Sequence, residues 1–425
     1  MLPMVQVFGL YPGQSDSLRE AVAVPAPRDL AIRYHRSGNV LWAVETGLGL
    51  LIPALLLFTG LSARLRSWAA QASGRWLPTV VLYAALFAVL VALLTVPLAY
   101  YGGYVRQHEY GLSNQSLEQW LGDWVKGVAL TAIGLAVVLW IPYLLLRRSP
   151  RRWWLYAGLA SVPVTTLLLV IAPVWVDPLF NDFEPLENRA LESRILELAE
   201  RAGIEGSRVY QVNKSVDTKL VNAYVTGIGG TKRIVLWDTL LEKLEPDQVL
   251  FVTAHEMGHF VLRHTLAVIG ATAILVTIAL FVVHLSATAL IARFSRRFGF
   301  DHLSDVASFP LLLLLGGVAS FVLTPVVLAL SRNQEHEADR FALEITRNNR
   351  AAATTFVRLQ EENLGVPRPG RLYMLWRGSH PSLGSRVDFA NQYRPWERGE
   401  ELRYEHRFRR PVSLVTACPR DEDSP

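Results

Sequence analysis

The chain has 425 residues, of which 51% are hydrophobic, and its mean hydropathy is +0.25, which excludes an ordinary water-soluble protein. The net charge of +5 would suggest a nucleic-acid partner in a soluble protein, but the arginines cluster at the ends of apolar stretches, so we predict membrane anchoring and no nucleic-acid partner. The single cysteine, Cys418, excludes a disulfide framework and a cysteine-based metal site.

The first part of the chain is a predicted membrane region. Residues 1–38 form a polar segment interrupted by prolines and arginines, so we expect no spanning helix there. Six later stretches approach the ~20 apolar residues that a bilayer helix needs, namely 39–61, 77–101, 126–146, 153–175, 266–291 and 307–330. The first four give a membrane region over 39–176, and the last two give a two-span hairpin over 266–330.

A polar segment, residues 177–265, separates the fourth span from the fifth. Its pattern predicts a helix over 186–202 and short strands over 208–212, 222–226 and 233–237, with glycines 227, 229 and 230 between the last two. An exposed edge strand could pair with an extended peptide substrate. An ordinary small sheet without a ligand is the alternative.

The same segment contains the motif His255-Glu256-Met257-Gly258-His259. Pro246 suits the first turn of a helix that continues through the motif, so His255 and His259, four residues apart, share one helix face. Two imidazoles so placed can bind one zinc ion, and Glu256 can take a proton from a water molecule at the open coordination position. We therefore predict a catalytic segment with a zinc site.

A third ligand is predicted after the sixth span, in residues 331–410. Glu335 would complete the protein ligands, and Asp339, one turn further, could accept a hydrogen bond from a ligating histidine. A solvated acidic helix face is the alternative. Because a short loop joins the last two spans, the residues on either side of the hairpin emerge at one membrane face. Residues 411–425 are expected to be a disordered tail.

Other ionisable residues have weaker signals. Glu45 and His284 lie within predicted spans, where each is expected either to face a water-filled interior or to make a satisfied contact between helices. His264 and His336 neighbour the metal motif but lie off its face, so no ligand role is predicted for them.

Ordered motifs along the chain resemble the type I CaaX prenyl protease family, the integral-membrane a-factor-converting zinc endopeptidases. Besides the HExxH motif they are EYGLSNQS at 109–116, PLFNDFEPL at 178–186, NAY at 222–224, KRIVL at 232–236, DTLL at 238–241, SRNQEHEAD at 331–339 and HPSLGSR at 380–386. The resemblance covers about residues 24–394. Family members often have seven spans around a large intramembrane chamber, whereas six spans are predicted here.

The resemblance implies a role for each matching site residue. It implies zinc ligation by His255, His259 and Glu335, general-base catalysis by Glu256, and an outer-sphere role for Asp339. It also implies that His380 and Arg386 lie at the site, where they polarise the substrate carbonyl and organise the acidic groups. Asn222 and Ala223 would lie on the strand that holds the substrate.

We thus predict a mainly α, polytopic membrane protein with about six transmembrane helices and a zincin-like α+β catalytic domain at the membrane surface. The predicted function is zinc-dependent endopeptidase activity near the bilayer surface, with one Zn²⁺ per chain, on a peptide or protein substrate; the sequence leaves open whether that substrate is lipidated or membrane-bound. Two alternatives stay open at this point: a metalloprotease for quality control of membrane proteins, and a non-catalytic multi-span protein with a structural zinc site.

The side of the membrane that the site faces is ambiguous. The resemblance implies the cytosolic side. The positive-inside rule implies the opposite side, because ten arginines in short loops fall on the face away from the site: Arg64, Arg66, Arg75, Arg147, Arg148, Arg151, Arg152, Arg293, Arg296 and Arg297.

Overall fold

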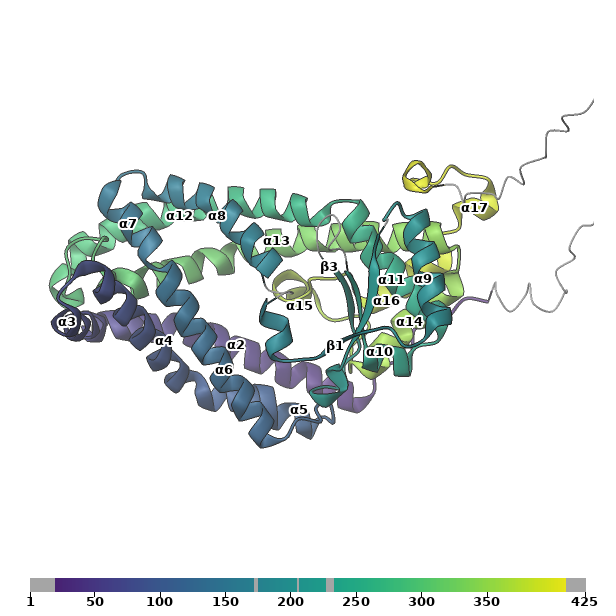
Figure 1. The fold of residues 1–425 in the computed structure, drawn as a ribbon, viewed down its shortest axis with the longest axis horizontal. Coiled ribbons are helices and arrows are strands. Elements are labelled where there is room, and N and C mark those ends of the chain that lie inside the picture. The colour runs from purple at the N-terminus through teal and green to yellow at the C-terminus, as the bar shows by residue number, and fades with distance from the viewer. Residues whose placement is uncertain (1–19, 172–174, 205, 227–232, 410–425) are drawn as a thin grey trace, which may run out of the picture.

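The computed structural model of the protein describes residues 20–171, 175–204, 206–226 and 233–409. Long helices run from the end of the molecule that carries α3 (Leu61–Ser73) and α7 (Trp140–Arg148) to the end that carries a small sheet and shorter helices (Figure 1). The predicted tail at 411–425, the glycines 227, 229 and 230, and the first half of the polar N-terminal segment lie outside the described residues.

The predicted multi-pass helical fold is confirmed. In the described part of the chain, five helical segments are long and apolar enough to cross a membrane: Asp29–Phe58, Trp76–Glu109, Leu117–Arg148, His264–Phe298 and Val306–Thr346. They contain α2 (Asp29–Phe58), α4 (Trp76–Tyr100), α5 (Arg106–Glu109), α6 (Leu117–Val138), α7, α12 (His264–Phe298) and α13 (Phe309–Thr346).

Three boundaries differ from the sequence prediction. The fourth predicted span falls on α8 (Trp153–Ile171), an apolar helix shorter than the other five. Helix α2 begins at Asp29, so the end of the expected polar segment is already helical. Helix α13 continues without a break from the sixth span through the predicted third ligand, because the change from apolar to polar residues near 331 does not interrupt helix geometry.

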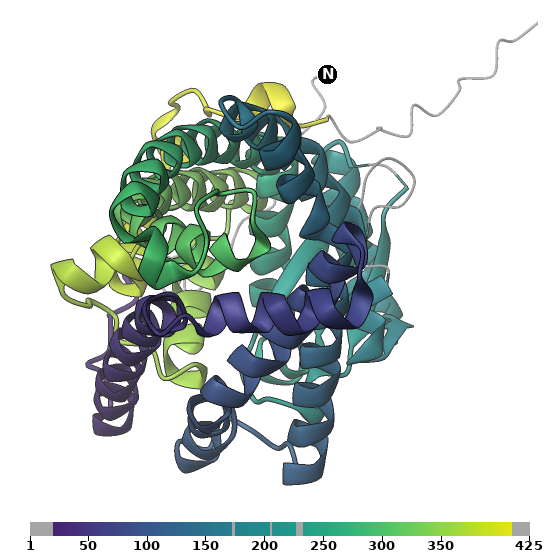
Figure 2. The same ribbon diagram turned by 90° about the vertical axis from the view of Figure 1, so that its left-hand side faces the viewer.

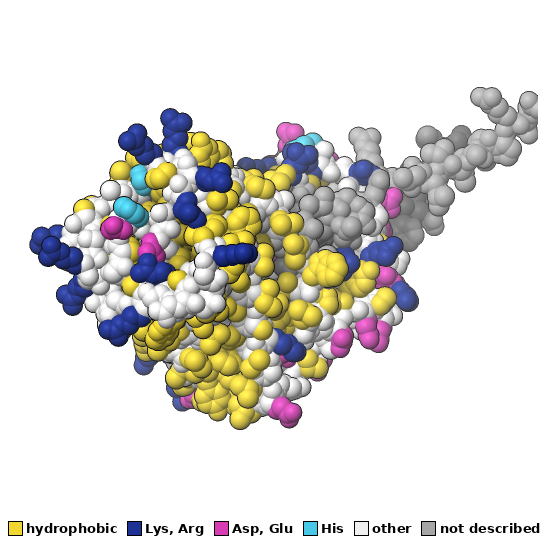
Figure 3. Space-filling view, turned by 60° about the vertical axis from the view of Figure 1, so that its left-hand side comes forward, with side chains coloured by type: hydrophobic (Ala, Val, Ile, Leu, Met, Phe, Trp, Pro, Cys, Tyr) yellow, Lys and Arg dark blue, Asp and Glu magenta, His cyan; other side chains and the backbone are white. Residues whose placement is uncertain are grey.

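The outer surface of the helical part suits lipid. Large hydrophobic side chains on different spans are solvent-exposed in the isolated chain, such as Leu93 at 60%, Ile133 at 61% and Val322 at 65%. Figure 2 looks onto the α3 end, and Figure 3 shows a broad hydrophobic surface with lysine and arginine side chains gathered at the end that comes forward. An apolar belt next to a basic rim is the pattern of a membrane-embedded surface.

The two ionisable residues within spans have different environments. His284 Nδ1 accepts a hydrogen bond of 3.1 Å from Trp153 Nε1, which is a satisfied contact between α12 and α8. Glu45 on α2 lines two neighbouring cavities of about 380 and 410 Å³.

The sheet has four strands in the order β1-β2-β4-β3, namely β1 (Phe183–Pro185), β2 (Arg208–Val212), β3 (Ala223–Thr226) and β4 (Arg233–Trp237). Strands β2 and β4 pair in parallel, and the other two pairings are antiparallel. The predicted strands 208–212 and 233–237 are confirmed at the same residues, and β3 begins one residue after the predicted Asn222. The sequence pattern missed β1, which has three residues.

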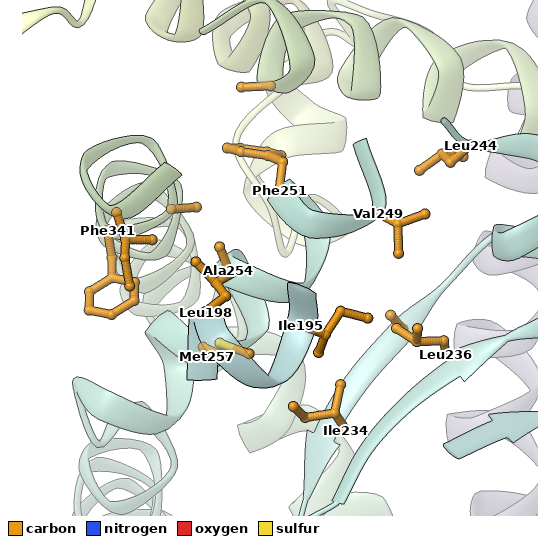
Figure 4. Close-up of a cluster of buried hydrophobic side chains, with 14 of the residues drawn as sticks. Ile195, Leu198, Ile234, Leu236, Leu244, Val249, Phe251, Ala254, Met257 and Phe341 are labelled. Atoms are coloured by element: carbon orange, nitrogen blue, oxygen red, sulfur yellow. The ribbon is translucent and has the colours of Figure 1, made fainter. Parts of the chain in front are cut away.

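Shorter helices surround the sheet. They are α9 (Arg189–Arg201), α10 (Asp238–Lys243), α11 (Pro246–Val261), α14 (Asn349–Glu362), α15 (Arg371–Trp376), α16 (Leu383–Gln392) and α17 (Pro395–Arg398). Ile195 and Leu198 of α9, Ile234 and Leu236 of β4, and Met257 of α11 form one buried core with the end of α13 (Figure 4). Full burial of each large apolar side chain contributes about 1.5–3 kcal/mol to holding these elements together.

Two of the motifs that carry the family resemblance join the membrane helices to this unit. Ser113, after α5, forms a β-bridge with Thr218, and its Oγ donates to the Asp217 carbonyl at 2.9 Å. Asn181 Nδ2 donates to the Asp217 carboxylate at 2.8 Å. These bonds fix the sheet relative to the spans.

Candidate metal centre

Helix α11 presents the HExxH motif on its side away from the core. The helix begins at Pro246, after a capping box in which Glu245 and Gln248 bond each other's backbone N–H groups. Phe251, Ala254 and Met257 are buried in the core (Figure 4). The 3.6-residue period then places His255 and His259 on a different face, which contacts α13.

A close crossing of α11 and α13 brings the third residue to the two histidines. A Cβ atom on Gly258 would lie only 3.2 Å from Ala338 Cα and 3.2 Å from Phe341 Cδ1. Glycine at the second variable position of the motif therefore lets the helices approach closely. One turn from Ala338, Glu335 reaches His255 and His259 as a result.

Three side chains converge at this crossing. His255 Nε2 lies 3.1 Å from His259 Nε2 and 3.2 Å from Glu335 Oε2, and His259 Nε2 lies 3.4 Å from Glu335 Oε1. A tetrahedral ion with metal–ligand bonds of about 2.0–2.1 Å has ligand atoms roughly 3.3 Å apart. The three residues thus form the only group of three or more metal-ligating side chains that we find in the described part of the chain.

The charges at the crossing favour a cation. Burial disfavours the charged imidazole of His255, but hydrogen bonds with Asp339 and Glu335 outweigh this and raise its pKa to about 10. Glu335 Oε2 is buried and lies 3.2 Å from His255 Nε2. A metal ion would compensate the negative charge of the Glu335 and Asp339 carboxylates, so the donor set fits a metal.

Asp339 and Arg386 lie directly behind His255. Asp339 Oδ1 lies 2.9 Å from His255 Nδ1, and Arg386 donates to both Asp339 oxygens, from Nε at 2.8 Å and from Nη2 at 2.6 Å. Both side chains are buried, with Asp339 only 1% exposed. The bidentate ion pair holds the carboxylate where it can orient the imidazole.

Glu256 faces the same centre without an ion-pair partner in the described residues. Burial raises the pKa of its carboxyl group, and the neighbouring His255 and His259 partly offset this rise. A carboxylate with a raised pKa near a metal site is suited to accept a proton at neutral pH.

Two more histidines touch the predicted ligands. His380 Nε2 lies 3.3 Å from Glu335 Oε1, and its Nδ1 lies 2.8 Å from Ser379 Oγ. His264, for which the sequence predicted no ligand role, contacts His259 through their Nδ1 atoms at 3.0 Å, so it lies behind that ligand. The sequence signal for this contact is weak, because it depends on the turn between α11 and α12.

Asn222 and Ala223 lie at the start of β3, which packs against α11. Ala223 is buried, whereas Asn222 is exposed and its Oδ1 accepts a hydrogen bond from Ala223 N at 2.9 Å. One edge of β3 pairs with β4, and no described strand pairs with the other edge.

The fold and the site together indicate a class of protein. The protein combines several membrane spans with a His-His-Glu group that can hold a metal ion. A carboxylate lies beside this group, and a strand with one unpaired edge lies near it. These are the features of a membrane metallopeptidase. Residues 185–394 match peptidase family M48, and residues 29–182 match the CAAX prenyl protease N-terminal region of five membrane helices. The chain belongs to peptidase family M48, in its CAAX prenyl protease type.

Individual relatives agree with this assignment. The chain is 40% identical to the uncharacterized metalloprotease YhfN of Bacillus subtilis, over 86% of each chain. It is 30% identical to the CAAX prenyl protease 1 homolog of Dictyostelium discoideum, over 71% of this chain and 70% of that protein. The crystal structure of S. mikatae Ste24p has the same fold, with a TM-score of 0.76 and 22% identity over 89% of this chain and 94% of that chain. The protein is therefore a membrane metallopeptidase, and the non-catalytic alternative is not favoured.

Proposed function

We propose that His255, His259 and Glu335 hold a zinc ion and that the protein is a zinc endopeptidase for lipidated, membrane-bound proteins. The observation that carries the metal assignment is the close spacing of the nitrogen and oxygen atoms that the three residues offer. Three protein ligands leave a coordination position open, as catalytic zinc requires. When bound there, zinc polarises a carbonyl oxygen and makes water acidic enough to serve as a nucleophile near neutral pH.

The residues around the zinc site then transfer a proton, stabilise the oxyanion or orient a zinc ligand. Glu256 takes the proton of the attacking water and passes it to the leaving amine. His380 donates from Nε2 to the oxyanion, in the tautomer in which Nδ1 accepts a hydrogen bond from Ser379. Asp339 accepts from His255 Nδ1, and Arg386 keeps Asp339 in place, so these two residues orient a ligand rather than touch the substrate.

The unpaired edge of β3 is the proposed position of the substrate backbone. An extended peptide that forms main-chain hydrogen bonds with this edge, starting at Asn222 and Ala223, would lie along a strand that packs against α11. This arrangement would deliver a peptide carbonyl to the helix that carries the HExxH motif.

The proposed substrate class rests on the membrane part of the molecule. Curated relatives are named CAAX prenyl proteases. A cavity of about 410 Å³ between α2 and α4 is lined mainly by apolar side chains, among them Ile52, Phe87 and Leu98, and it suits a hydrocarbon chain.

The test is substrate profiling of the purified, zinc-loaded protein in detergent. A prenylated peptide that ends in a CaaX sequence should be cleaved faster than the same peptide without the prenyl group. Fragments of an unfolded membrane protein serve as the third substrate. Faster cleavage of these fragments would contradict the substrate class and support the quality-control alternative. Absence of any zinc-dependent cleavage would contradict the proposed enzyme.

We also propose that the metal centre faces the cytosol, as the resemblance to the type I CaaX prenyl proteases implies. A matched pair of variants in a Cys418→Ser background tests this: Arg398→Cys at the sheet end and His302→Cys at the α3 end, both at exposed side chains. A membrane-impermeant maleimide added to intact cells should label only His302→Cys. Labelling of only Arg398→Cys would place the centre outside, as the positive-inside count predicts.

A further inference from the structure

A polar cavity lies beside the metal centre, on the membrane side of His380. It has a volume of about 380 Å³ and is lined by α2, by α15 and by the segment from Gly378 to Leu383, which includes His380. Because His380 also contacts Glu335, the cavity, which we call the α2–α15 cavity, opens directly next to the proposed site of peptide hydrolysis.

Two guanidinium groups converge in this cavity. A Cβ atom on Gly38 of α2 would lie 2.9 Å from Arg106 Nη2 and 3.7 Å from Arg377 Nη2. Gly38 is buried, and the missing side chain leaves the space in which both arginines reach the helix. Two positive charges this close repel each other, and a nearby anion would offset the repulsion.

Neither arginine is neutralised by an acidic group within the described chain. Arg106, only 5% exposed, donates to Ser37 Oγ at 3.0 Å and to the Tyr34 carbonyl at 2.7 Å, and it lies 3.8 Å from the centre of the Tyr34 ring. Arg377 donates to Asn39 Oδ1 and lies over the rings of Trp42 and Tyr373. All these partners are neutral, and a guanidinium has five N–H donors, so donors remain for a ligand.

The remaining cavity lining adds to the positive character. Glu45 is the only acidic residue among the described lining residues, and it stands two helical turns from Gly38 and forms no ion pair with either arginine within that part of the chain. His35 lies on the α2 wall, next to Tyr373. Leu41, Met374 and Val366 provide apolar surface between the charged groups.

We propose that the α2–α15 cavity binds the C-terminal carboxylate of the peptide substrate, with Arg377 as the main contact and Arg106 as the buried charge behind it. A carboxylate matches the planar donor fork of arginine, and the apolar lining suits the side chains of the last residues. Since His380 both lines the cavity and contacts Glu335, the segment after the scissile bond would enter the cavity. This inference rests on the proposed peptidase function.

The direct test compares two substrates on the wild-type protein. One is the prenylated CaaX peptide with a free C-terminal carboxylate, and the other is the same peptide with a C-terminal amide. Hydrogen bonds to charged groups predict that kcat/KM for the acid exceeds that for the amide by roughly 10- to 100-fold, mainly through KM. Equal cleavage of the two peptides overturns the carboxylate site and leaves the peptidase proposal intact. If neither peptide is cleaved, the peptidase proposal itself fails.

Substitutions at Arg377 test whether this residue causes the preference for the acid peptide. Arg377→Gln should bring the ratio of kcat/KM for the acid to kcat/KM for the amide close to one, and a thermal unfolding temperature close to that of the wild type shows that the variant is folded. Arg371→Gln is the matched control, because Arg371 begins α15, the helix that Arg377 directly follows, and it is exposed and does not line the cavity. Arg377→Lys, which keeps the charge but loses the planar fork, should retain part of the preference. An unchanged preference in Arg377→Gln overturns the assignment.

A lipid phosphate could supply the same anionic chemistry, and a further experiment separates the two sources. The acid and amide peptides are cleaved in detergent with and without added phosphatidylglycerol. A substrate carboxylate site predicts that the acid preference is present without the lipid. If Arg377→Gln alters only the response to phosphatidylglycerol and not the acid-to-amide ratio, the cavity binds a headgroup and the proposal is wrong.

Discussion

Arginine side chains are buried in two neighbouring regions of this protein, and their charges are balanced in different ways. Behind the metal centre, Arg386 forms a bidentate ion pair with the buried Asp339, which in turn contacts His255. In the α2–α15 cavity, Arg106 and Arg377 converge at Gly38 and bond only neutral groups among the described residues. His380 contacts Glu335 and lines the cavity, so it belongs to both regions.

The difference separates a positioning role from a binding role. A buried charge with a buried partner is costly to disturb, because loss of either group leaves the other uncompensated. A charge next to a cavity that has only neutral partners can instead obtain its counter-ion from a ligand. We therefore propose that the first arrangement fixes a metal ligand in place and that the second is available to the substrate.

The largest expected effect is on stability, and it tests the difference between the two regions directly. Arg386→Gln leaves the Asp339 carboxylate buried without its guanidinium partner, so we expect a loss of stability of about 3–5 kcal/mol. Arg377→Gln removes the same charge from the cavity and should cost less than about 1 kcal/mol. Thermal unfolding of both variants in one detergent, after chelation of the metal, measures the two effects. Equal losses would contradict the distinction between the regions.

A smaller effect is expected at His380, where the regions meet. Loss of an oxyanion donor typically lowers turnover by about 100- to 1,000-fold, so His380→Ala should reduce kcat by this factor while KM and zinc content stay close to wild type. Steady-state kinetics on the metal-loaded variant measure both constants. A rise in KM at unchanged kcat would move His380 from the reaction to the binding of the substrate.

The smallest expected effect is on zinc affinity, and it tests the role of Asp339 behind the metal centre. Asp339→Asn keeps a hydrogen-bond acceptor for His255 but removes the negative charge, so zinc affinity should fall by about 10- to 100-fold. Glu337→Gln is the matched control, since Glu337 lies on the same helix and pairs with Arg340 and Tyr404 rather than with a predicted ligand. Competition with a chelator measures both affinities, and an unchanged value for Asp339→Asn would remove the residue from its proposed role.

Much of the fold was predictable from local patterns. The apolar stretches located the membrane helices, the HExxH spacing located the two histidines on one helix face, and alternation located β2 and β4 at their observed residues. Strand β1 was missed because three residues are too few for a pattern. The continuation of α13 from the membrane to Glu335 was missed because a change in polarity resembles a boundary.

Features that depend on the packing of distant segments could not be predicted. The sequence shows Gly258 only as a possible helix breaker, whereas its role is to admit Ala338 and Phe341 of α13. Nothing in the local sequence around Arg106 indicates that it meets Arg377 at Gly38. Such contacts appear only when the helices are assembled.

The central claim is that this metal centre hydrolyses peptide bonds with Glu256 as the base. The most direct measurement determines zinc content and turnover of the prenylated peptide on the same preparations of wild-type protein and Glu256→Gln. We expect about one zinc per chain in both, because the base is not a ligand, and a fall in turnover of about 100- to 10,000-fold in the variant. Wild-type protein that is free of zinc when purified without chelators, or a variant with near wild-type turnover, would contradict the account.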